Sequence, residues 1–174
     1  APVLVCRATR DVALGPPDAA LSSPGVSTVG TAGDQARTMI WIARSSWQFP
    51  AANSVFLRLG EATGSYAAIR LLATSSGLQS YAQNSQSSDT PLDLRLSLNS
   101  PPRAIAYRWN GTTVTVRAKE KVASGTYTNP AGLSKTAELG TLGDGLAVVY
   151  NRALTDTQCD LVLGWLAQRY QIPM

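Results

Sequence analysis

The stretch that decides the fold is residues 145–158, GLAVVYNRALTDTQ. Its apolar first part, 145–150, ends at an Asn-Arg pair and leads within a few residues into a helix start. Thr155 and Gln158 match a capping box, in which each side chain accepts a hydrogen bond from the other residue's backbone N–H. Asp156 lies where a negative charge favours the helix dipole. The stretch therefore predicts a strand followed directly by a helix.

Beyond the capping box, apolar residues recur at helical spacing and predict a helix over 155–170. The opposite face carries Asp160, Gln168 and Arg169, and Pro173 ends the element. We expect the helix to lie against the rest of the protein as a lid on an edge or end. Its apolar stripe is Cys159, Val162, Leu163, Leu166 and Tyr170.

Upstream of this stretch, the chain consists of short predicted strands. Residues 92–98, LDLRLSL, alternate strictly, with four leucines on one face and three polar residues on the other. Alternation with a period of two indicates a strand with one buried face, so Leu94 and Leu96 should point inward. The other predicted strands are 38–44, 55–59, 66–73, 77–83, 103–109, 112–118 and 145–150.

The pair Asn110-Gly111 lies between two of these strands, 103–109 and 112–118. Both residues tolerate the positive φ of a tight primed turn, so the pair predicts a β-hairpin. Together with Thr112 it also matches an N-glycosylation pattern, but the hairpin explains it better.

Strands spaced about 8–12 residues apart, with turn clusters between them, indicate a sandwich or a barrel. A chain of 174 residues is most simply one domain. We expect an irregular N-terminal segment over 1–35, because 11–35 is rich in Gly, Pro, Ser and Ala. An all-β sandwich over 36–150 and the helix over 155–170 should follow.

Charge and residue content exclude several kinds of function. The net charge is +4, from 15 basic and 11 acidic residues, and the arginines are scattered, so we expect no nucleic-acid partner. No run of about 18 apolar residues occurs, so we expect no membrane partner. The chain has no histidine, and Cys6 and Cys159 lie far apart, which excludes a CxxC motif and a zinc spacing. Two buried thiols are favoured over a disulfide.

Three stretches together resemble the laminin-G-like branch of the concanavalin-A-like lectin/glucanase superfamily. Residues 38–44, with Trp41-Ile42, resemble its early core strand, and 107–118, YRWNGTTVTVRA, resemble its Asn-Gly-Thr hairpin. The opening stretch, 145–158, is the most specific match and resembles the family's closing strand and helix start. The resemblance covers about 36–172 and implies a jelly roll of two curved antiparallel sheets with a short C-terminal helix. Family members bind glycans or proteins, hydrolyse β-glucans, or serve as structural modules, so the fold alone does not decide the function.

The distribution of acidic residues argues against catalysis. Glucanases of this superfamily need paired carboxylates on one strand face, in a pattern close to Glu-x-Asp-x-Glu, about 5–5.5 Å apart for retention. No such pattern occurs, and without histidine there is no Ser-His-Asp triad. We therefore expect no enzymatic activity and no catalytic residue. The acidic residues are Asp11, Asp18, Asp34, Glu61, Asp89, Asp93, Glu120, Glu138, Asp144, Asp156 and Asp160.

The sequence also predicts no metal and no cofactor. It has no cluster of Asp and Asn of the kind that holds calcium in legume lectins. Laminin-G domains can use one or two carboxylates at the sandwich rim, for which Asp34 and Asp144 are candidates, but a turn-forming role is favoured for both.

Sugar binding would use aromatic faces with amide partners. Trp41 and Trp165 belong to apolar core stretches, whereas Tyr107 and Trp109 could line either the core or an exposed concave sheet. For each loop aromatic residue, local packing is the favoured alternative to ligand contact. The candidate binding residues are Trp47, Gln48 and Phe49 in one loop, Tyr81 and Asn84 at a strand end, and Tyr127 and Asn129 in the 124–134 loop.

Two functions follow as hypotheses. The preferred one is a non-catalytic structural or adhesion component of a virion or cell surface, with partner subunits such as those of a capsid or tail. A domain that is rich in Ala and Arg, free of His and without an attached catalytic domain favours it. The alternative is a free-standing carbohydrate-binding lectin domain with a glycan partner. Both hypotheses place the protein outside the cell or on a virion surface.

Overall fold

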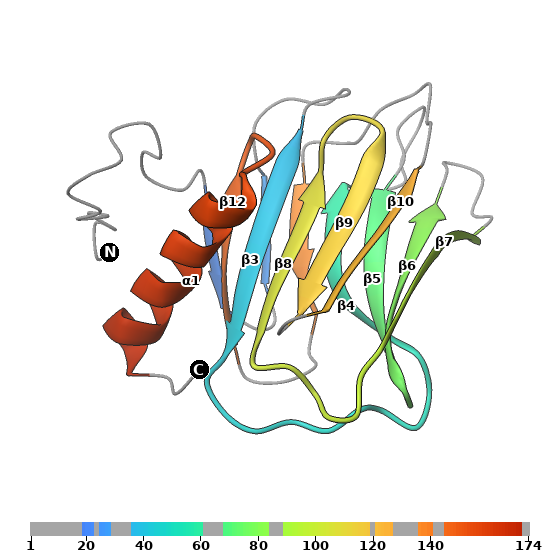
Figure 1. Ribbon diagram of the computed structural model, residues 1–174, viewed down its shortest axis with the longest axis horizontal. Coiled ribbons are helices and arrows are strands. Elements are labelled where there is room, and N and C mark those ends of the chain that lie inside the picture. The colour runs from blue at the N-terminus through green and yellow to red at the C-terminus, as the bar shows by residue number, and fades with distance from the viewer. Residues whose placement is uncertain are drawn as a thin grey trace.

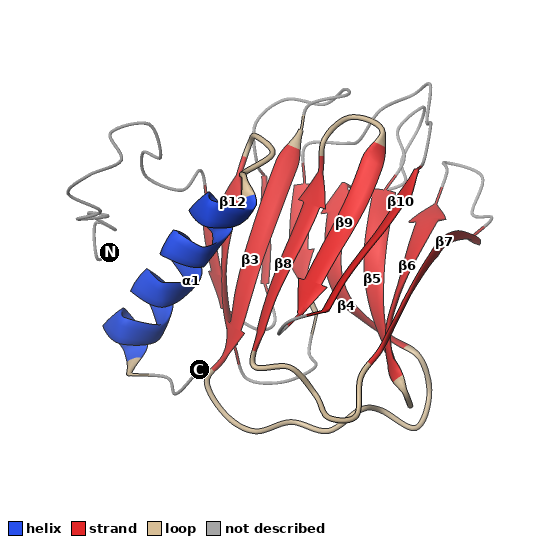
Figure 2. Cartoon of the chain, in the orientation of Figure 1, coloured by secondary structure: helices blue, strands red, loops and turns tan. Residues whose placement is uncertain are grey.

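The structure is a computed structural model that describes residues 19–22, 25–28, 36–60, 68–83, 89–118, 121–126, 136–140 and 145–171. These ranges hold strands and one helix (Figure 2). In chain order the elements are β1 (Ala19–Ser22), β2 (Gly25–Thr28), β3 (Arg37–Ala43), β4 (Ser54–Gly60), β5 (Ala68–Thr74), β6 (Gly77–Gln83), β7 (Asp89–Ser97), β8 (Ala104–Trp109), β9 (Thr113–Ala118), β10 (Lys121–Thr126), β11 (Thr136–Leu139), β12 (Gly145–Tyr150) and α1 (Asp156–Tyr170).

The strands form two six-stranded antiparallel sheets that face each other as a sandwich (Figure 1). Sheet A has the order β1-β12-β3-β8-β9-β10, and sheet B has the order β2-β11-β4-β5-β6-β7. In sheet A, β12 pairs with β3 from Gly145↔Ala43 to Tyr150↔Thr38, so the closing strand lies beside the early core strand. The predicted fold class, an antiparallel sandwich with a C-terminal helix, is confirmed.

The eight predicted strands correspond to β3–β9 and β12, and four other strands were not predicted. β1 and β2 are the first strands of sheets A and B, so the expectation of an irregular segment over 1–35 is wrong for these residues. β10 (KVASGT) and β11 (TAEL) contain few large apolar side chains. Their pairing with neighbouring strands, rather than a period-two pattern of their own, makes them strands.

The main core lies between the two sheets and is rich in aromatic side chains. Trp41, Tyr107 and Trp109 are fully buried in it, which decides the open alternative for Tyr107 and Trp109 in favour of the core. The Tyr107 hydroxyl of sheet A lies 2.8 Å from the buried Ser80 hydroxyl of sheet B. This hydrogen bond satisfies both polar groups and links the sheets across the core.

The strand β7 confirms part of the predicted leucine alternation. Leu96 is only 5% exposed and belongs to the main core, whereas its neighbours Arg95 and Ser97 are exposed. Leu98, just beyond the strand, is also buried. The side chains of Leu92 and Leu94 lie outside the described residues.

The helix α1 lies on the outer face of sheet A, beside β3 and β12 (Figure 1), rather than on an edge or end as expected. Cys159, Val162 and Leu166 pack there on outward-facing apolar side chains of the sheet, and Trp165 is partly buried beside them. Tyr170, predicted in the apolar stripe, is 37% exposed at the helix end. Within the described ranges, no helix has the length and apolar character needed to cross a membrane.

The start of α1 is fixed by its cap and by two ion pairs. The predicted capping box of Thr155 and Gln158 is present in both directions. Arg108 on β8 contacts Asp156 at 2.7 Å, and Arg117 on β9 contacts Asp160 at 2.6 Å. The polar face of the helix is thereby attached to the sheet that its apolar face covers.

The hairpin between β8 and β9 differs in detail from the expected turn. Asn110 N–H donates to the Thr113 carbonyl at 3.2 Å, so Gly111 and Thr112 are the two central residues. Of the residues of this turn, Gly111 alone takes a positive φ, of 104°. The Asn110 side chain instead accepts hydrogen bonds from the backbone N–H groups of Thr112 and Thr113. The predicted hairpin is confirmed, but the prediction of Asn-Gly as its central pair is wrong.

The buried thiol of Cys159 leads to a pH-dependent stability. Cys159 is free and fully buried, and Cys6 lies outside the described residues. Burial raises the pKa of the thiol from 9.0 to about 11. Because the folded protein then keeps the proton to a higher pH than the unfolded chain, the stabilisation is complete below pH 9 and is lost as the pH rises toward 11.

We expect this loss to reach about 1 kcal/mol by about pH 10. Urea unfolding of the native protein and of Cys159→Ala at about pH 8 and pH 10 measures it. The difference in unfolding free energy between the native protein and Cys159→Ala should be smaller by that amount at the higher pH. An unchanged difference would contradict the inferred burial. Tyr107, whose pKa burial also raises, begins to contribute only above about pH 10 and is common to both proteins.

Candidate functional site

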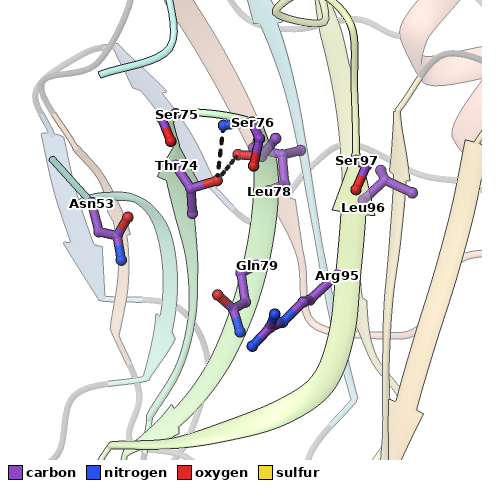
Figure 3. A pocket seen from close by; sticks show the side chains of 10 residues that line it. Asn53, Thr74, Ser75, Ser76, Leu78, Gln79, Arg95, Leu96 and Ser97 are labelled. Atoms are coloured by element: carbon purple, nitrogen blue, oxygen red, sulfur yellow. Dashed lines mark hydrogen bonds between the residues drawn. The ribbon is translucent and has the colours of Figure 1, made fainter. Parts of the chain in front are cut away.

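A polar hollow of about 270 Å³ lies where β5 turns into β6, beside the end of β7 (Figure 3). Residues of the turn, of the two strands beyond it and of the loop before β4 surround this hollow. The lining residues are Asn53, Thr74, Ser75, Ser76, Gly77, Leu78, Gln79, Arg95, Leu96 and Ser97.

The turn at this hollow is held by hydrogen bonds and by one glycine. Thr74 Oγ1 donates to the Gly77 carbonyl at 3.1 Å, and Leu98 N–H donates to the Ser76 carbonyl at 3.1 Å. Gly77 has a φ of 148°, and a Cβ on it would lie 2.1 Å from the Leu96 carbonyl oxygen. Only glycine therefore allows β6 and β7 to approach this closely at the wall of the hollow.

The side chains around the hollow offer many hydrogen-bonding groups and one charge. Asn53, Ser75, Ser76 and Ser97 are exposed, so their amide and hydroxyl groups are accessible to a ligand. Figure 3 shows the Gln79 amide and the Arg95 guanidinium extending toward each other from neighbouring strands. Hydroxyl and amide groups both donate and accept, whereas guanidinium only donates. This set suits a small, hydroxyl-rich ligand that carries a carboxylate or other acceptor.

One hydrogen bond connects a lining residue of the hollow to a neighbouring residue on the outer face of sheet B. The Tyr81 hydroxyl donates to Gln79 Oε1 at 3.0 Å, which joins the hollow to the next outward-facing residue of β6. In the sheet register Tyr81 stands opposite Arg70, and Arg70 stands opposite Arg58. Arg58 forms an ion pair with Glu138 on β11.

The charges on this outer face affect one another. Burial, together with the neighbouring charge of Arg58, lowers the pKa of Arg70, and Tyr81 acts in the opposite direction. Arg70 nevertheless stays protonated at neutral pH, because arginine side chains are effectively always protonated in proteins. Among the described residues, Arg70 therefore places a positive charge in the middle of the outer face of sheet B.

The predicted binding loop with Trp47, Gln48 and Phe49 lies elsewhere, in the connection from β3 to β4. Trp47 packs on Phe56 and on the edge of Trp41, at ring centroid distances of 5.1 and 6.0 Å, and its Nε1–H donates to the Pro102 carbonyl at 2.9 Å. Trp47 and Phe49 are half-buried, and Gln48 is exposed. The structure thus gives Trp47 a packing role, and a role of this loop in binding stays a prediction.

The other predicted site residues are placed only in part. Tyr81 is half-buried beside the hollow, as described above. Asn84, Tyr127 and Asn129 lie outside the described residues, as do the rim candidates Asp34 and Asp144. The structure therefore brings one predicted residue, Tyr81, next to the hollow.

The described residues hold no group of three or more side chains suited to bind a metal ion. The carboxylates whose contacts the structure describes are used in ion pairs: Glu138 with Arg58, Asp156 with Arg108, and Asp160 with Arg117. Of the described residues that line the hollow, none is acidic.

Sequence reasoning did not find the hollow because its residues are unremarkable one by one. The segment TSSG at 74–77 reads only as a polar turn, and Arg95 reads as the wet face of a strand. The pairing Gln79↔Arg95 between β6 and β7 brings the two together. A search for polar residues at the turn-proximal, outward positions of adjacent strands could have identified this pair.

No protein-family model and no curated protein matches this chain. Solved structures with a similar fold include a botulinum neurotoxin serotype D binding domain, with a TM-score of 0.57 and 11% identity over 86% of this chain and 42% of that one. The binding domain of botulinum neurotoxin DC in complex with SialylT has a TM-score of 0.53 and 12% identity, over 85% of this chain and 46% of that one.

The carbohydrate-binding module CBM40 of a Ruminococcus gnavus sialidase, bound to α2,3-sialyllactose, has a TM-score of 0.51 and 12% identity. The match covers 84% of this chain and 98% of that module, whereas the chain spans less than half of the neurotoxin binding domains. At identities this low, the structural similarity indicates a common fold only. The function has to be argued from the site. The chain therefore shares the fold of these binding domains, a sandwich of two antiparallel sheets.

Proposed function

We propose that this protein is a non-catalytic carbohydrate-binding module that holds its ligand in the hollow between the β5–β6 turn and β7. The hollow itself carries the proposal, because hydroxyl and amide groups of Asn53, Ser76 and Gln79 line it beside a turn that is held by hydrogen bonds. Sugar hydroxyls donate and accept hydrogen bonds at once, and these side chains can match both roles.

The chemistry of the hollow also supports binding without turnover. Hydrolysis of a glycosidic bond needs two carboxyl groups on either side of the bond. The lining residues include none, and the charged one is the cation Arg95. Among the described residues, a sugar held there meets hydrogen-bond donors and acceptors and no carboxyl group.

Structures of the same fold give independent support for this class of ligand. The R. gnavus CBM40 was solved with sialyllactose, and a neurotoxin DC binding domain was solved with SialylT. We extend the ligand class of these proteins, glycans, to this chain. We also propose that this chain belongs to the laminin-G-like branch, on the basis of the sequence motifs at 107–118 and 145–158.

A role in adhesion at a cell or virion surface is consistent with glycan binding in this hollow. A purely structural subunit of a particle would instead cover the hollow with a partner chain, and its exposed serines would be buried on assembly. A glycan array with the isolated protein separates these hypotheses, because only a lectin binds without a partner subunit.

The decisive comparison uses three Gln→Ala variants that share the same chemical change. Gln79 lines the hollow, Gln48 lies in the predicted binding loop, and Gln168 is exposed on α1 over the other sheet. For the glycan that binds best on the array, Gln79→Ala should weaken the affinity about tenfold, since loss of a buried hydrogen bond costs about 1–3 kcal/mol. Gln168→Ala should leave it unchanged.

The outcomes of this comparison are distinct. A loss in Gln48→Ala with none in Gln79→Ala would contradict the hollow and favour the loop. A blank array would contradict carbohydrate binding altogether. Melting temperatures of the three variants serve as the control that each affinity refers to a folded protein.

A further inference from the structure

We propose that two copies of this chain associate through the edge strand β10. The two β10 strands pair antiparallel, so that sheet A continues from one copy into the other. The interface lies on the side of the sandwich where β10 runs beside β7 (Figure 1). This inference does not depend on the proposed function, and its test needs no glycan.

The first feature that supports the interface is the position of β10 at the end of sheet A. Within the described part of the chain, β10 has β9 as its one strand neighbour, paired without interruption from Lys121↔Ala118 to Thr126↔Thr113. In an antiparallel edge strand, every second residue directs its N–H and C=O groups away from the neighbouring strand. β10 therefore offers a regular row of backbone donors and acceptors to a further strand.

The second feature is that β10 lacks the protection found on β7, the edge strand of sheet B beside it. Proteins commonly protect such edges with a proline, a bulge or a charged side chain. β7 contains Pro91, and its register with β6 shifts between Gln79↔Arg95 and Tyr81↔Pro91. β10, with the sequence KVASGT, has no proline and pairs with β9 in a constant register.

The one charge of β10 does not block its open edge. Lys121 Nζ donates to the Ser97 carbonyl of β7 at 2.6 Å, so the ammonium group is directed toward sheet B. The next residue, Val122, is 53% exposed, more than any other large apolar side chain in the described ranges. Covering this side chain with a partner strand would remove apolar surface from water, which favours association.

A second copy of β10 fits this edge because the strand is complementary to itself. An antiparallel pair centred on Ala123 keeps like faces together and places Val122 opposite Ser124 of the partner subunit. The two Val122 side chains are then diagonal neighbours, about 7–8 Å apart, within contact distance for side chains. The two Lys121 residues lie four positions apart along the strands, about 14 Å. That separation exceeds the Debye length of about 8 Å at physiological ionic strength, so their repulsion is weak.

Sedimentation velocity of the native chain over a range of concentrations measures the association. We expect a dimer that dissociates on dilution. The double variant Val122→Lys/Ser124→Lys sets like charges directly opposite each other twice and should weaken dimerisation about tenfold or more. The control, Leu161→Lys/Gln168→Lys, adds the same two charges at exposed positions of α1 and should leave dimerisation unchanged.

A mixing experiment tests the strand pairing itself. The variant Val122→Asp/Ser124→Asp should also be monomeric alone, but should form a heterodimer when mixed with Val122→Lys/Ser124→Lys, because each lysine then faces an aspartate. Melting temperatures show whether each variant is folded. Should a variant fail to fold, hydrogen exchange of the native protein decides, since the amides of 122–126 should exchange more slowly at high than at low protein concentration.

Each outcome supports or overturns the interface. A native chain that stays monomeric at about 1 mM overturns it, because the dissociation constant is then above that concentration. Equal losses in the two lysine variants, a mixture that stays monomeric, or exchange at 122–126 that does not depend on concentration overturn pairing through β10. A native dimer that is lost in Val122→Lys/Ser124→Lys and restored in the mixture supports it.

Discussion

Leu96→Asp is expected to leave little folded protein at neutral pH. Leu96 is 5% exposed in the core between the sheets, where it stands opposite Leu78. The substitution removes about 2–3 kcal/mol of apolar burial and adds a carboxylate without a partner, which costs several kcal/mol more. Since a domain of this kind has about 5–15 kcal/mol of stability in total, most or all of it is lost.

The matched control is Leu161→Asp, at a leucine that is 43% exposed on α1. Its cost should stay below about 1 kcal/mol. Near-UV circular dichroism follows both variants, because the buried Trp41 and Trp109 give a signal only in a packed core. A Leu96→Asp protein with native near-UV signal and an unchanged melting temperature would show that the register of β7 is wrong.

Gly145→Ala is expected to cost about 3 kcal/mol or more, although it adds a single methyl group. A Cβ at Gly145 would lie 2.1 Å from Nε1 of Trp41 and 2.8 Å from the Ile42 carbonyl oxygen. Trp41 cannot yield, because it is fully buried and packs on the edge of Phe56 at a centroid distance of 4.6 Å. The first residue of β12 must therefore be glycine for the closing strand to pair with β3.

Gly164→Ala is the control for this substitution, because a Cβ at this position of α1 meets nothing within 4 Å. Alanine in place of glycine inside a helix should raise the unfolding free energy by about 0.5–1 kcal/mol. Urea unfolding of both variants measures the difference. Changes of the same sign and size would contradict the packing of Gly145 on Trp41.

The fold was predictable from the sequence where local patterns and the final structure agree. The capping box at Thr155 works through contacts within four residues, so its signal survives intact in α1. β7 and β12 carry their own apolar patterns. β1 and β10 do not, because each is an outer strand whose conformation depends on a neighbour, namely β12 and β9. The position of α1 on the face of sheet A also depends on partners, Arg108 and Arg117, that lie far away in sequence.

The candidate site was less predictable, for a related reason. Local packing was the favoured alternative for Trp47, but no local pattern shows that its packing partners are Trp41 and Phe56. Conversely, the sequence indicates only that Gln79 and Arg95 lie on solvent-facing sides of their strands. The register of β6 and β7 places them opposite each other. Tyr81 was predicted as a strand-end aromatic, but its link to the hollow through Gln79 appears only in three dimensions.

The most direct test of the central claim is backbone amide chemical-shift mapping of the native protein with the glycan that binds best on the array. We expect the shifts to concentrate at residues 74–79 and 95–97 around the hollow. Shifts confined to the loop 44–53 or to α1, or no shifts at saturating glycan, would contradict binding in this hollow.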